Sequence, residues 1–312
     1  MKTINESLPT SLMEAVKYFS DPIVCLETIA AVKWPHGPVC PKCNSKRLSF
    51  LKTRLMWKCL DCKKQFSVKI GTIFEDSPIG LDKWIMAMWM LANCKNGISS
   101  YEVARHLKVT QKTAWFMLHR IREAMHRGSI EKLSGQVEVD ETFIGGKARN
   151  MHASKRAKKI TGTGGKDKAA ALGFLQRGGE VRANVVENRR KPLLQAEVRE
   201  NVTPGSEVYT DALASYDGLE KDYLHEVIDH AIAYVRGQVH TSGLENFWSL
   251  LKRAIRGTYV SVEPFHLMRY LGEEVFRYNE RKITDAERFQ EVLGSVSGKR
   301  LTWNELTCQE AG

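Results

Sequence analysis

The segment HTSGLENFWSLLKR, from His240 to Arg253, is the stretch around which the rest of the chain is organised. It places an acid, an aromatic ring and a base so that Glu245, Trp248 and Lys252 fall on one face of a helix. Such a stripe suits a site that holds a metal ion beside a phosphate. It is equally typical of a solvated helix face with one aromatic side chain in the core, so the upstream sequence has to distinguish the two interpretations.

The composition indicates a globular protein with a polyanionic partner. The chain has 312 residues, of which 43% are hydrophobic, enough for two or three domains with buried cores. The formal net charge of +11 favours nucleic acid over a membrane as the partner, and a basic protein without such a partner is the alternative. No apolar run approaches the roughly 18 residues of a membrane span, and the N-terminus does not resemble a secretory signal. We therefore expect a cytoplasmic protein without a membrane partner.

The cysteines predict a structural zinc site. The chain has seven, an odd number, which argues against a disulfide framework in a protein without a secretory signal. Four of them form two CxxC pairs, CPKC and CLDC, separated by fifteen residues. A redox function for these pairs is the weaker interpretation, because two pairs with short β-like flanks are typical of tetrahedral zinc. The expected zinc ligands are Cys40, Cys43, Cys59 and Cys62.

Helical patterns surround this ribbon. Residues 11–32 read as helical with a break at Asp21-Pro22, and residues 81–92 form a strongly apolar helix. The segment SSYEVARHLKVTQKTAWFMLHRIREAM begins with a capping-type Ser99 and a nearby Glu102, and it predicts a helix, a short turn and a second helix. This pattern favours a DNA-binding helix-turn-helix over a plain helical hairpin. Its expected base-reading residues are Gln111, Lys112 and Thr113.

The second half of the chain reads as a mixed α/β domain. The alternating segment QVEVDETFIG predicts a strand from Gln136, and Arg177-Gly178-Gly179 joins two further strands in a hairpin. Between them, residues 147–168 contain eight Lys or Arg against one acid and read as a mobile basic loop, either a DNA clamp or a disordered insertion. The remaining expected elements are helix 191–201, strand 207–211, helix 212–219, strand 225–229, helix 244–256 and helix 264–280.

Three acids stand at distinctive places in this domain. Asp140 lies in the first strand, Asp211 ends a later strand, and Glu245 begins a helix 34 positions further on. Carboxylates of this kind suit magnesium, and a two-metal reaction on a phosphodiester requires such a ligand set. Two neighbouring acids are weaker candidates. Glu138 shares a strand face with Asp140 and is expected to be a solvated edge acid rather than a ligand, and Glu141 faces the other way and is expected to be structural.

In combination, these motifs make the chain resemble the insertion-sequence transposases of the ISXO-like group. The matching stretches are VKWP with CPKC and CLDC, then VEVDETFIGGK, YTDALASYDGL and HTSGLENFWSLLKR, within about residues 12–306. The resemblance implies a zinc ribbon ahead of a ribonuclease H-like DDE domain. It also implies catalytic magnesium or manganese on Asp140, Asp211 and Glu245, and a DNA-contacting Lys252. The implied partners are terminal inverted repeats and target DNA, bound by a homo-oligomer on paired ends in association with the nucleoid.

Some assignments within the site stay open. The third acid position varies in the group, so Asn246 is an alternative to Glu245; the seven-residue step to Lys252 favours Glu245. His240 precedes the helix and either contacts a DNA phosphate or satisfies a loop carbonyl. Trp248 is expected to stack or pack against the DNA.

The sequence therefore predicts a DDE-type transposase that binds the ends of an insertion sequence and catalyses phosphodiester hydrolysis and strand transfer. A non-catalytic zinc-ribbon and helix-turn-helix regulator, or a nuclease without joining activity, is the alternative. The expected domains are an N-terminal helical segment (1–35), the zinc ribbon (36–70), the helix-turn-helix-like region (71–130), the ribonuclease H-like domain (131–285) and a C-terminal tail (286–312).

Overall fold

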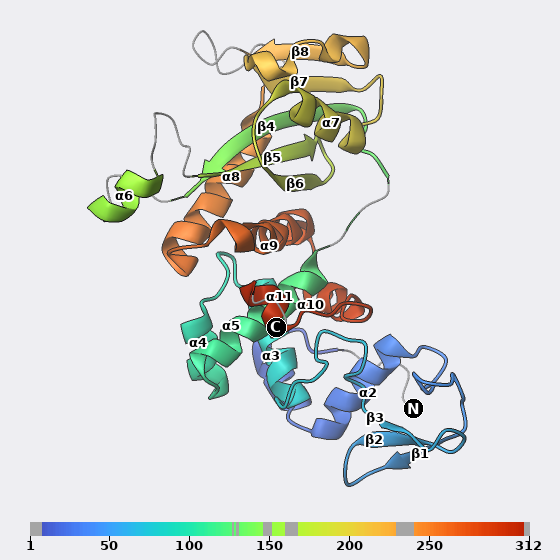
Figure 1. The fold of residues 1–312 in the computed structure, drawn as a ribbon. Helices are drawn as coiled ribbons and strands as arrows, with labels where there is room; N and C mark the ends of the chain where they lie inside the picture. Colours follow the sequence, from blue (N-terminus) through green and yellow to red (C-terminus); the bar gives the residue numbers. More distant parts are fainter. Residues whose placement is uncertain are drawn as a thin grey trace. The chain divides into compact units, whose positions relative to one another are not determined.

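The computed structural model describes residues 8–126, 128, 131–145, 152–159, 168–228 and 240–308. The chain divides into two compact units (Figure 1). The first combines residues 1–126 with residues 280–312, and the second comprises residues 127–279. Each unit has its own hydrophobic core and is considered by itself.

Two short helices open the described part of the first unit. They are α1 (Leu12–Tyr18) and α2 (Pro22–Lys33), and they confirm the predicted helical segment and its break. The break arises because the Asp21 carboxylate accepts a hydrogen bond from the Ile23 N–H, while a proline occupies the first turn of α2.

A three-stranded antiparallel sheet follows, and its strands are β1 (Leu48–Leu51), β2 (Met56–Cys59) and β3 (Gln65–Phe66). The hairpin of β1 and β2 connects the two CxxC pairs, and Cys59 of the second pair is the last residue of β2. Trp57 in the central strand packs edge-on against Trp34 with ring centroids 5.2 Å apart and stacks on Phe66 at 6.1 Å. These aromatic contacts provide only a small core, so the ribbon needs another source of stability.

The predicted helix, short turn and second helix are present as α4 (Ser100–Leu107) and α5 (Gln111–Met125), which follow α3 (Leu81–Asn93). Ser99 and Glu102 form the predicted capping box at the start of α4. Lys108 adopts a left-handed conformation with φ of 49° and turns the chain toward Thr110, which caps α5. Beyond its first two turns α5 is almost entirely buried, so only its N-terminal end is available to a partner.

The C-terminal residues differ from the predicted tail, because they form α10 (Asp285–Gly294) and α11 (Trp303–Thr307) and complete the core of the first unit. Phe289 of α10 is fully buried and contacts Trp89 of α3 with ring centroids 5.2 Å apart. Two Thr-x-x-Glu capping boxes, one before each helix, were the overlooked signal.

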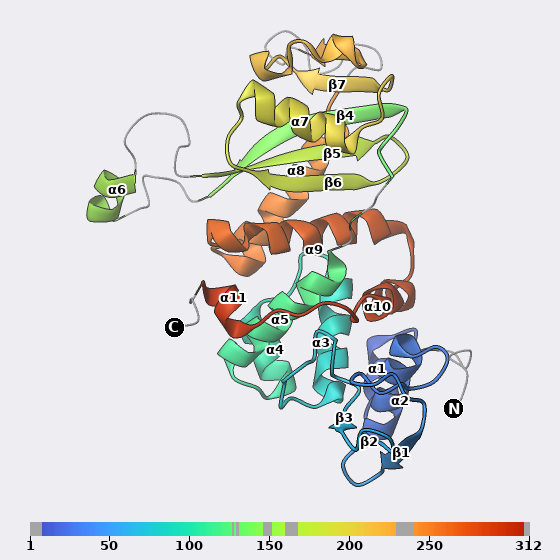
Figure 2. The same ribbon diagram turned by 45° about the vertical axis from the view of Figure 1, so that its right-hand side comes forward.

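The second unit contains a five-stranded sheet in the order β6-β5-β4-β7-β8 (Figure 1), and Figure 2 shows β6, β5, β4 and β7 from a second direction. Its strands are β4 (Gln136–Ile144), β5 (Ala169–Gln176), β6 (Val181–Val186), β7 (Glu207–Asp211) and β8 (Leu224–Ile228). β4, β5 and β6 pair in antiparallel fashion, whereas β7 pairs in parallel with β4 and β8 in parallel with β7. This mixed sheet with helices packed on it is a ribonuclease H-like fold, as predicted.

Strand alternation divides the core of this unit between the two faces of the sheet. Val139 and Phe174 point toward α7 (Lys191–Asn201), together with a cluster that includes Leu194. Ala171 and Leu175 point the other way, into a cluster with α8 (Ser242–Ala254) and α9 (Leu267–Asn279). Asp140 lies on the α8 side, so the helix that carries Glu245 covers the sheet face that carries Asp140.

Three predictions in this unit need correction or fall outside the structure. Residues 212–219, expected as one helix, form two short 3-10 turns, Ala214–Tyr216 and Leu219–Lys221, because Gly218 adopts φ of 98° between them. The predicted basic loop contains a helix, α6 (Ala153–Lys159), and most of its other residues lie outside the described part of the chain. α8 continues into a π-helical turn over Ile255–Tyr259.

Candidate functional site

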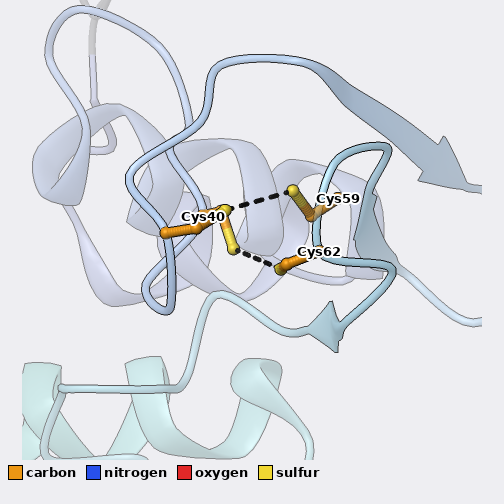
Figure 3. Close-up of side chains that lie close together, drawn as sticks. Cys40, Cys59 and Cys62 are labelled. Atoms are coloured by element: carbon orange, nitrogen blue, oxygen red, sulfur yellow. Dashed lines mark hydrogen bonds between the residues drawn. The ribbon is translucent and has the colours of Figure 1, made fainter.

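The four predicted zinc ligands come together in the first unit. One sulfur atom from each of Cys40, Cys43, Cys59 and Cys62 lies within 4.8 Å of the others, and Figure 3 shows three of the four residues facing one another. Backbone N–H groups of Cys62 and then Asp61 lower the pKa of the Cys59 thiol to about 6, which favours the thiolate that binds metal. Four converging sulfurs fit a structural zinc with no open position.

The parallel pairing of β4 and β7 places two predicted aspartates side by side. Gln136 pairs with Glu207 and Glu138 with Tyr209, and the same offset carried two residues further sets Asp140 beside Asp211. Ligand oxygens of these two residues and of Glu141 all lie within 4.8 Å of one another. The grouping of Asp140 and Asp211, 71 positions apart, therefore follows from strand register.

Glu141, which was expected to be structural, lies closer to the aspartates than the sequence indicated. One carboxylate oxygen pairs with Arg189 at 2.9 Å, and the other accepts a hydrogen bond from the Tyr216 hydroxyl at 2.7 Å. Its negative charge beside Asp140 adds to the electrostatic cost of ionising that aspartate. No local pattern in the sequence indicated this proximity, because Arg189 and Tyr216 are distant from Glu141 along the chain.

α8 brings the third acid and the base into a cavity beside Asp140. Among the residues that the structure describes, the cavity is lined by Asp140, Glu141, Thr142, Glu245, Trp248, Ser249, Lys252, Arg253, Arg256 and Gly257. Glu245 belongs to this lining and Asn246 does not. The cavity therefore has an acidic side from the sheet and Glu245, and a basic side from the last turns of α8.

Trp248 supports the site from within the core. Its ring is 3% exposed and its Nε1–H donates a hydrogen bond to Oδ2 of Asp140 at 3.0 Å. Gly173, the cross-strand partner of Asp140, makes room for the ring, because a Cβ there would lie 2.6 Å from the Trp248 side chain. The side chain also belongs to the lining of the cavity, and its expected stacking or packing against DNA stays a prediction.

Electrostatics favours a cation at the acidic side of the cavity. Burial, together with the charges of Glu141 and Asp211, raises the pKa of Asp140 to about 7. Burial also lowers the pKa of Lys252, an effect that the nearby Asp140 opposes. A divalent cation with oxygen ligands relieves the repulsion among the carboxylates, so the donor set fits such an ion.

Glu138, two residues before Asp140 on β4, contacts His240. Glu138 was expected to be a solvated edge acid, but its side chain is 1% exposed and pairs with Arg177 at 3.0 Å. Nδ1 of His240 lies 3.4 Å from the Glu138 carboxylate. The expectation for Glu138 failed because α8 and the β5–β6 hairpin cover that part of the strand.

The three expected base-reading residues gather at the start of α5. Gln111 donates a hydrogen bond to the Ser100 hydroxyl at 2.9 Å, and the Thr113 hydroxyl lies 2.8 Å from that of Thr110. The Lys112 ammonium lies over the ring of Trp303, 4.3 Å from its centroid. Lys112 is the exposed member of the three, so its charge is available to a phosphate.

The strand order, the paired aspartates and the nearby helix-borne acid define a ribonuclease H-like domain with an acidic metal site, joined here to a zinc ribbon. Residues 132–279 match the family model described as an ISXO2-like transposase domain, and residues 23–65 match a transposase zinc-ribbon domain. The chain belongs to the ISXO2-like transposase family.

Two relatives support this membership. An uncharacterised protein in the transposable element ISH50 of Halobacterium salinarum is 28% identical over 286 residues, which cover 85% of this chain and 95% of the relative. An uncharacterised transposase-like protein of Haemophilus influenzae is 33% identical over 100 residues, 32% of this chain and 80% of the relative. Among the described residues, none of the helices is long and apolar enough to cross a membrane.

Proposed function

We propose that this protein is a DNA transposase that binds the ends of an insertion sequence, hydrolyses a phosphodiester bond and transfers the freed 3′-hydroxyl to target DNA. The observation that carries the proposal is one cavity lined by Asp140, Glu245 and Lys252, with Asp211 beside Asp140. Acids gathered next to bases at an open cavity suit a reaction at a phosphate that is attacked by an oxygen nucleophile.

Asp140, Asp211 and Glu245 would hold Mg²⁺ or Mn²⁺. Such ions, when bound, activate water or a 3′-hydroxyl and stabilise the leaving oxygen. The chain's own contribution is positional, because the strand register fixes the two aspartates and the hydrogen bond from Trp248 orients the Asp140 carboxylate. No side chain in this scheme forms a covalent bond with the DNA.

The basic side of the cavity would bind the DNA strand. Lys252, Arg253 and Arg256 belong to the same lining as Glu245, and Lys and Arg side chains are typical contacts of DNA phosphates. In the first unit, the zinc ribbon and the exposed start of α5, with Lys112, would hold the terminal inverted repeat. His240 remains a predicted DNA contact, and we expect a homo-oligomer to hold paired ends.

A strand-cleavage assay tests the proposal against its alternatives. The full chain is incubated with a duplex that carries the terminal inverted repeats flanking its gene, with Mg²⁺ or Mn²⁺. We expect a nick that leaves a 3′-hydroxyl, followed by joined products when target DNA is added. Binding without nicking would instead identify a regulator, and nicking without joined products would identify a nuclease.

The identity of the third acid is tested by two adjacent substitutions. Glu245→Gln is expected to slow Mg²⁺-dependent nicking by a factor of roughly 10² or more, because it removes a charged ligand from the cavity. Asn246→Ala is its matched control and should stay within about threefold of the unmodified protein, a change under about 0.7 kcal/mol. Single-turnover nicking rates measure both effects. Full activity of Glu245→Gln would assign the third position to Asn246.

The DNA contact of Lys252 is tested by the salt dependence of binding. Lys252→Ala should weaken binding to a cleaved end and reduce the slope of log K against log salt by about one, as expected for the loss of one phosphate contact. Lys221→Ala, an exposed lysine at the end of a 3-10 turn away from the cavity lining, is the control. An unchanged slope for Lys252→Ala, measured by fluorescence anisotropy, would remove Lys252 from the DNA interface.

A further inference from the structure

We infer that Glu138 is a positioning residue that holds the first turn of α8 on β4 and thereby presents Glu245 to Asp140 and Asp211. The inference rests on the proposed function in taking Glu245 as the third acid. Glu138 is nearly inaccessible to solvent, although the sequence places it at a position where a solvated acid was expected.

The first observation is an unusual helix cap. The residue before α8, Thr241, makes no side-chain hydrogen bond that caps the helix. The backbone N–H of Leu244, in the first turn, instead donates to Oε2 of Glu138 at 3.1 Å. A carboxylate at a helix N-terminus also interacts favourably with the helix dipole. The cap of α8 is therefore supplied by the sheet rather than by the helix's own sequence.

The second observation is that Arg177 ties the same carboxylate to the chain that enters α8. Its Nε donates to Oε1 of Glu138 at 3.0 Å, and one of its terminal nitrogens donates to the carbonyl of His240 at 3.0 Å. Both Glu138 oxygens thus accept hydrogen bonds within the protein. Glu138 is therefore engaged as a structural acceptor, and the metal-ligand interpretation of this residue loses support.

The third observation is the close approach that Gly243 permits. A Cβ at this position would lie 2.8 Å from Oε2 of Glu138 and 2.1 Å from the side chain of Leu175. Both distances are too short for real atoms, so with a larger residue the Leu175 and Glu138 side chains or the first turn of α8 must shift. Glycine therefore lets the helix end approach the carboxylate closely.

A second hydrogen bond between α8 and β4 sets the orientation of the helix on the strand. One turn after Leu244, Trp248 donates to Asp140, which lies two residues after Glu138 on the same face of β4. Two residues of a strand span about 6.7 Å and four residues of a helix about 6 Å, so the two bonds match in spacing. Glu245 lies between these two attachment points, so its backbone is fixed relative to the aspartates.

The inference is tested first without metal, by hydrogen exchange in EDTA. In Glu138→Ala the amides of residues 244–247 should exchange about tenfold to a hundredfold faster, because a charge-assisted bond to the backbone is lost, whereas those of α7 should not change. Gly243→Ala should loosen the same turn without removing any acid. Ser242→Ala, at an exposed position of the same turn, is the matched control and should leave the exchange unchanged. Unchanged protection of residues 244–247 in Glu138→Ala would overturn the inference.

Nicking by the same variants then separates positioning from a general loss of stability. Glu138→Ala and Gly243→Ala should slow single-turnover nicking about tenfold or more, raise the Mg²⁺ concentration for half-maximal rate, and bind DNA within about twofold of the unmodified protein. Glu138→Gln keeps one acceptor oxygen and should fall between Glu138→Ala and the unmodified protein. A loosened first turn with unchanged nicking would overturn the inference.

A different failure would point to direct metal binding. If Glu138→Gln lost as much activity as a substitution of Asp140 while residues 244–247 stayed protected, Glu138 would be a ligand and the positioning role would be wrong. The unmodified protein distinguishes failure of the proposed function from failure of the positioning inference. If it failed to nick its own end with any divalent metal, the proposed function would fail, whereas the exchange experiment would still decide whether Glu138 holds α8.

Discussion

Replacing Asp140 with asparagine will abolish nicking while leaving the protein folded. The carboxylate lies within 4.8 Å of the ligand oxygens of Asp211 and Glu141 and is held by Trp248, so the substitution removes a central charge from the proposed metal site. We expect the single-turnover rate to fall by a factor of at least roughly 10³, or about 4 kcal/mol of transition-state stabilisation. Binding to the terminal repeat should change little, because the predicted end-binding residues lie in the first unit.

The same substitution should raise the thermal stability of the metal-free protein. Burial raises the pKa of Asp140 from 3.8 to about 7, so the folded state holds the proton more tightly than the unfolded chain. The resulting stability is present at low pH and is lost as the pH rises from about 4 to about 7. At pH 8 in EDTA the charged form costs the folded state roughly 2–4 kcal/mol, and asparagine removes that cost.

Calorimetry and the nicking assay together measure this pair of effects. Asp217→Asn, a substitution of an exposed acid in the same unit, is the control and should alter neither quantity. Retained nicking by Asp140→Asn would contradict the assigned role of Asp140. If the second unit of Asp140→Asn unfolded at a lower temperature than that of the unmodified protein at pH 8, the ionised Asp140 carboxylate would be stabilised by its surroundings more than its burial indicates.

Removal of zinc will unfold the ribbon and weaken binding to the terminal repeat. The three strands of the ribbon are short, with an aromatic core around Trp57, and zinc binding in comparable small domains contributes about 10–16 kcal/mol. Cys59→Ser should therefore lose the bound zinc, expose the amides of β1 and β2 to rapid exchange, and reduce affinity for the end by about tenfold or more.

Metal analysis and hydrogen exchange test this expectation directly. Cys308→Ser is the matched control, because Cys308 is exposed and lies outside the cysteine cluster. The unfolding midpoint of the second unit should not move in either variant, since that unit has a separate core. A protein that stayed zinc-free with a protected, ordered ribbon would rule out a structural metal.

The sequence predicted best where local chemistry decides the outcome. The CxxC pairs, the capping box at Ser99 and the strand beginning at Gln136 depend on neighbours a few residues away, and all three were located correctly. The predicted tail was wrong although its signal was also local. The Thr-x-x-Glu boxes were present, but their importance depends on apolar residues such as Phe289, which have a core to enter only in the folded unit.

The acids of β4 show the same difference between what local sequence predicts and what the folded structure decides. Alternation along β4 correctly placed Asp140 and Glu141 on opposite faces, yet it could not indicate that Glu138 would be buried. That outcome depends on Arg177 and on the first turn of α8, which are 39 and 106 positions from Glu138. A period of two specifies the face of a strand, whereas the partner that covers the face is specified by the tertiary fold.

By itself, the sequence determined the zinc ribbon, the order of the strands in the second unit, and the acids and bases from which a DNA-processing site can be built, because these follow from residue type and short-range spacing. Only the tertiary structure decided which acids meet. Parallel pairing of β4 with β7 brings Asp140 beside Asp211, and packing of α8 on the sheet buries Trp248 and turns Glu245 toward the same cavity. The physical reason is that long-range pairing and burial depend on how whole strands and helices pack together, which no local pattern encodes.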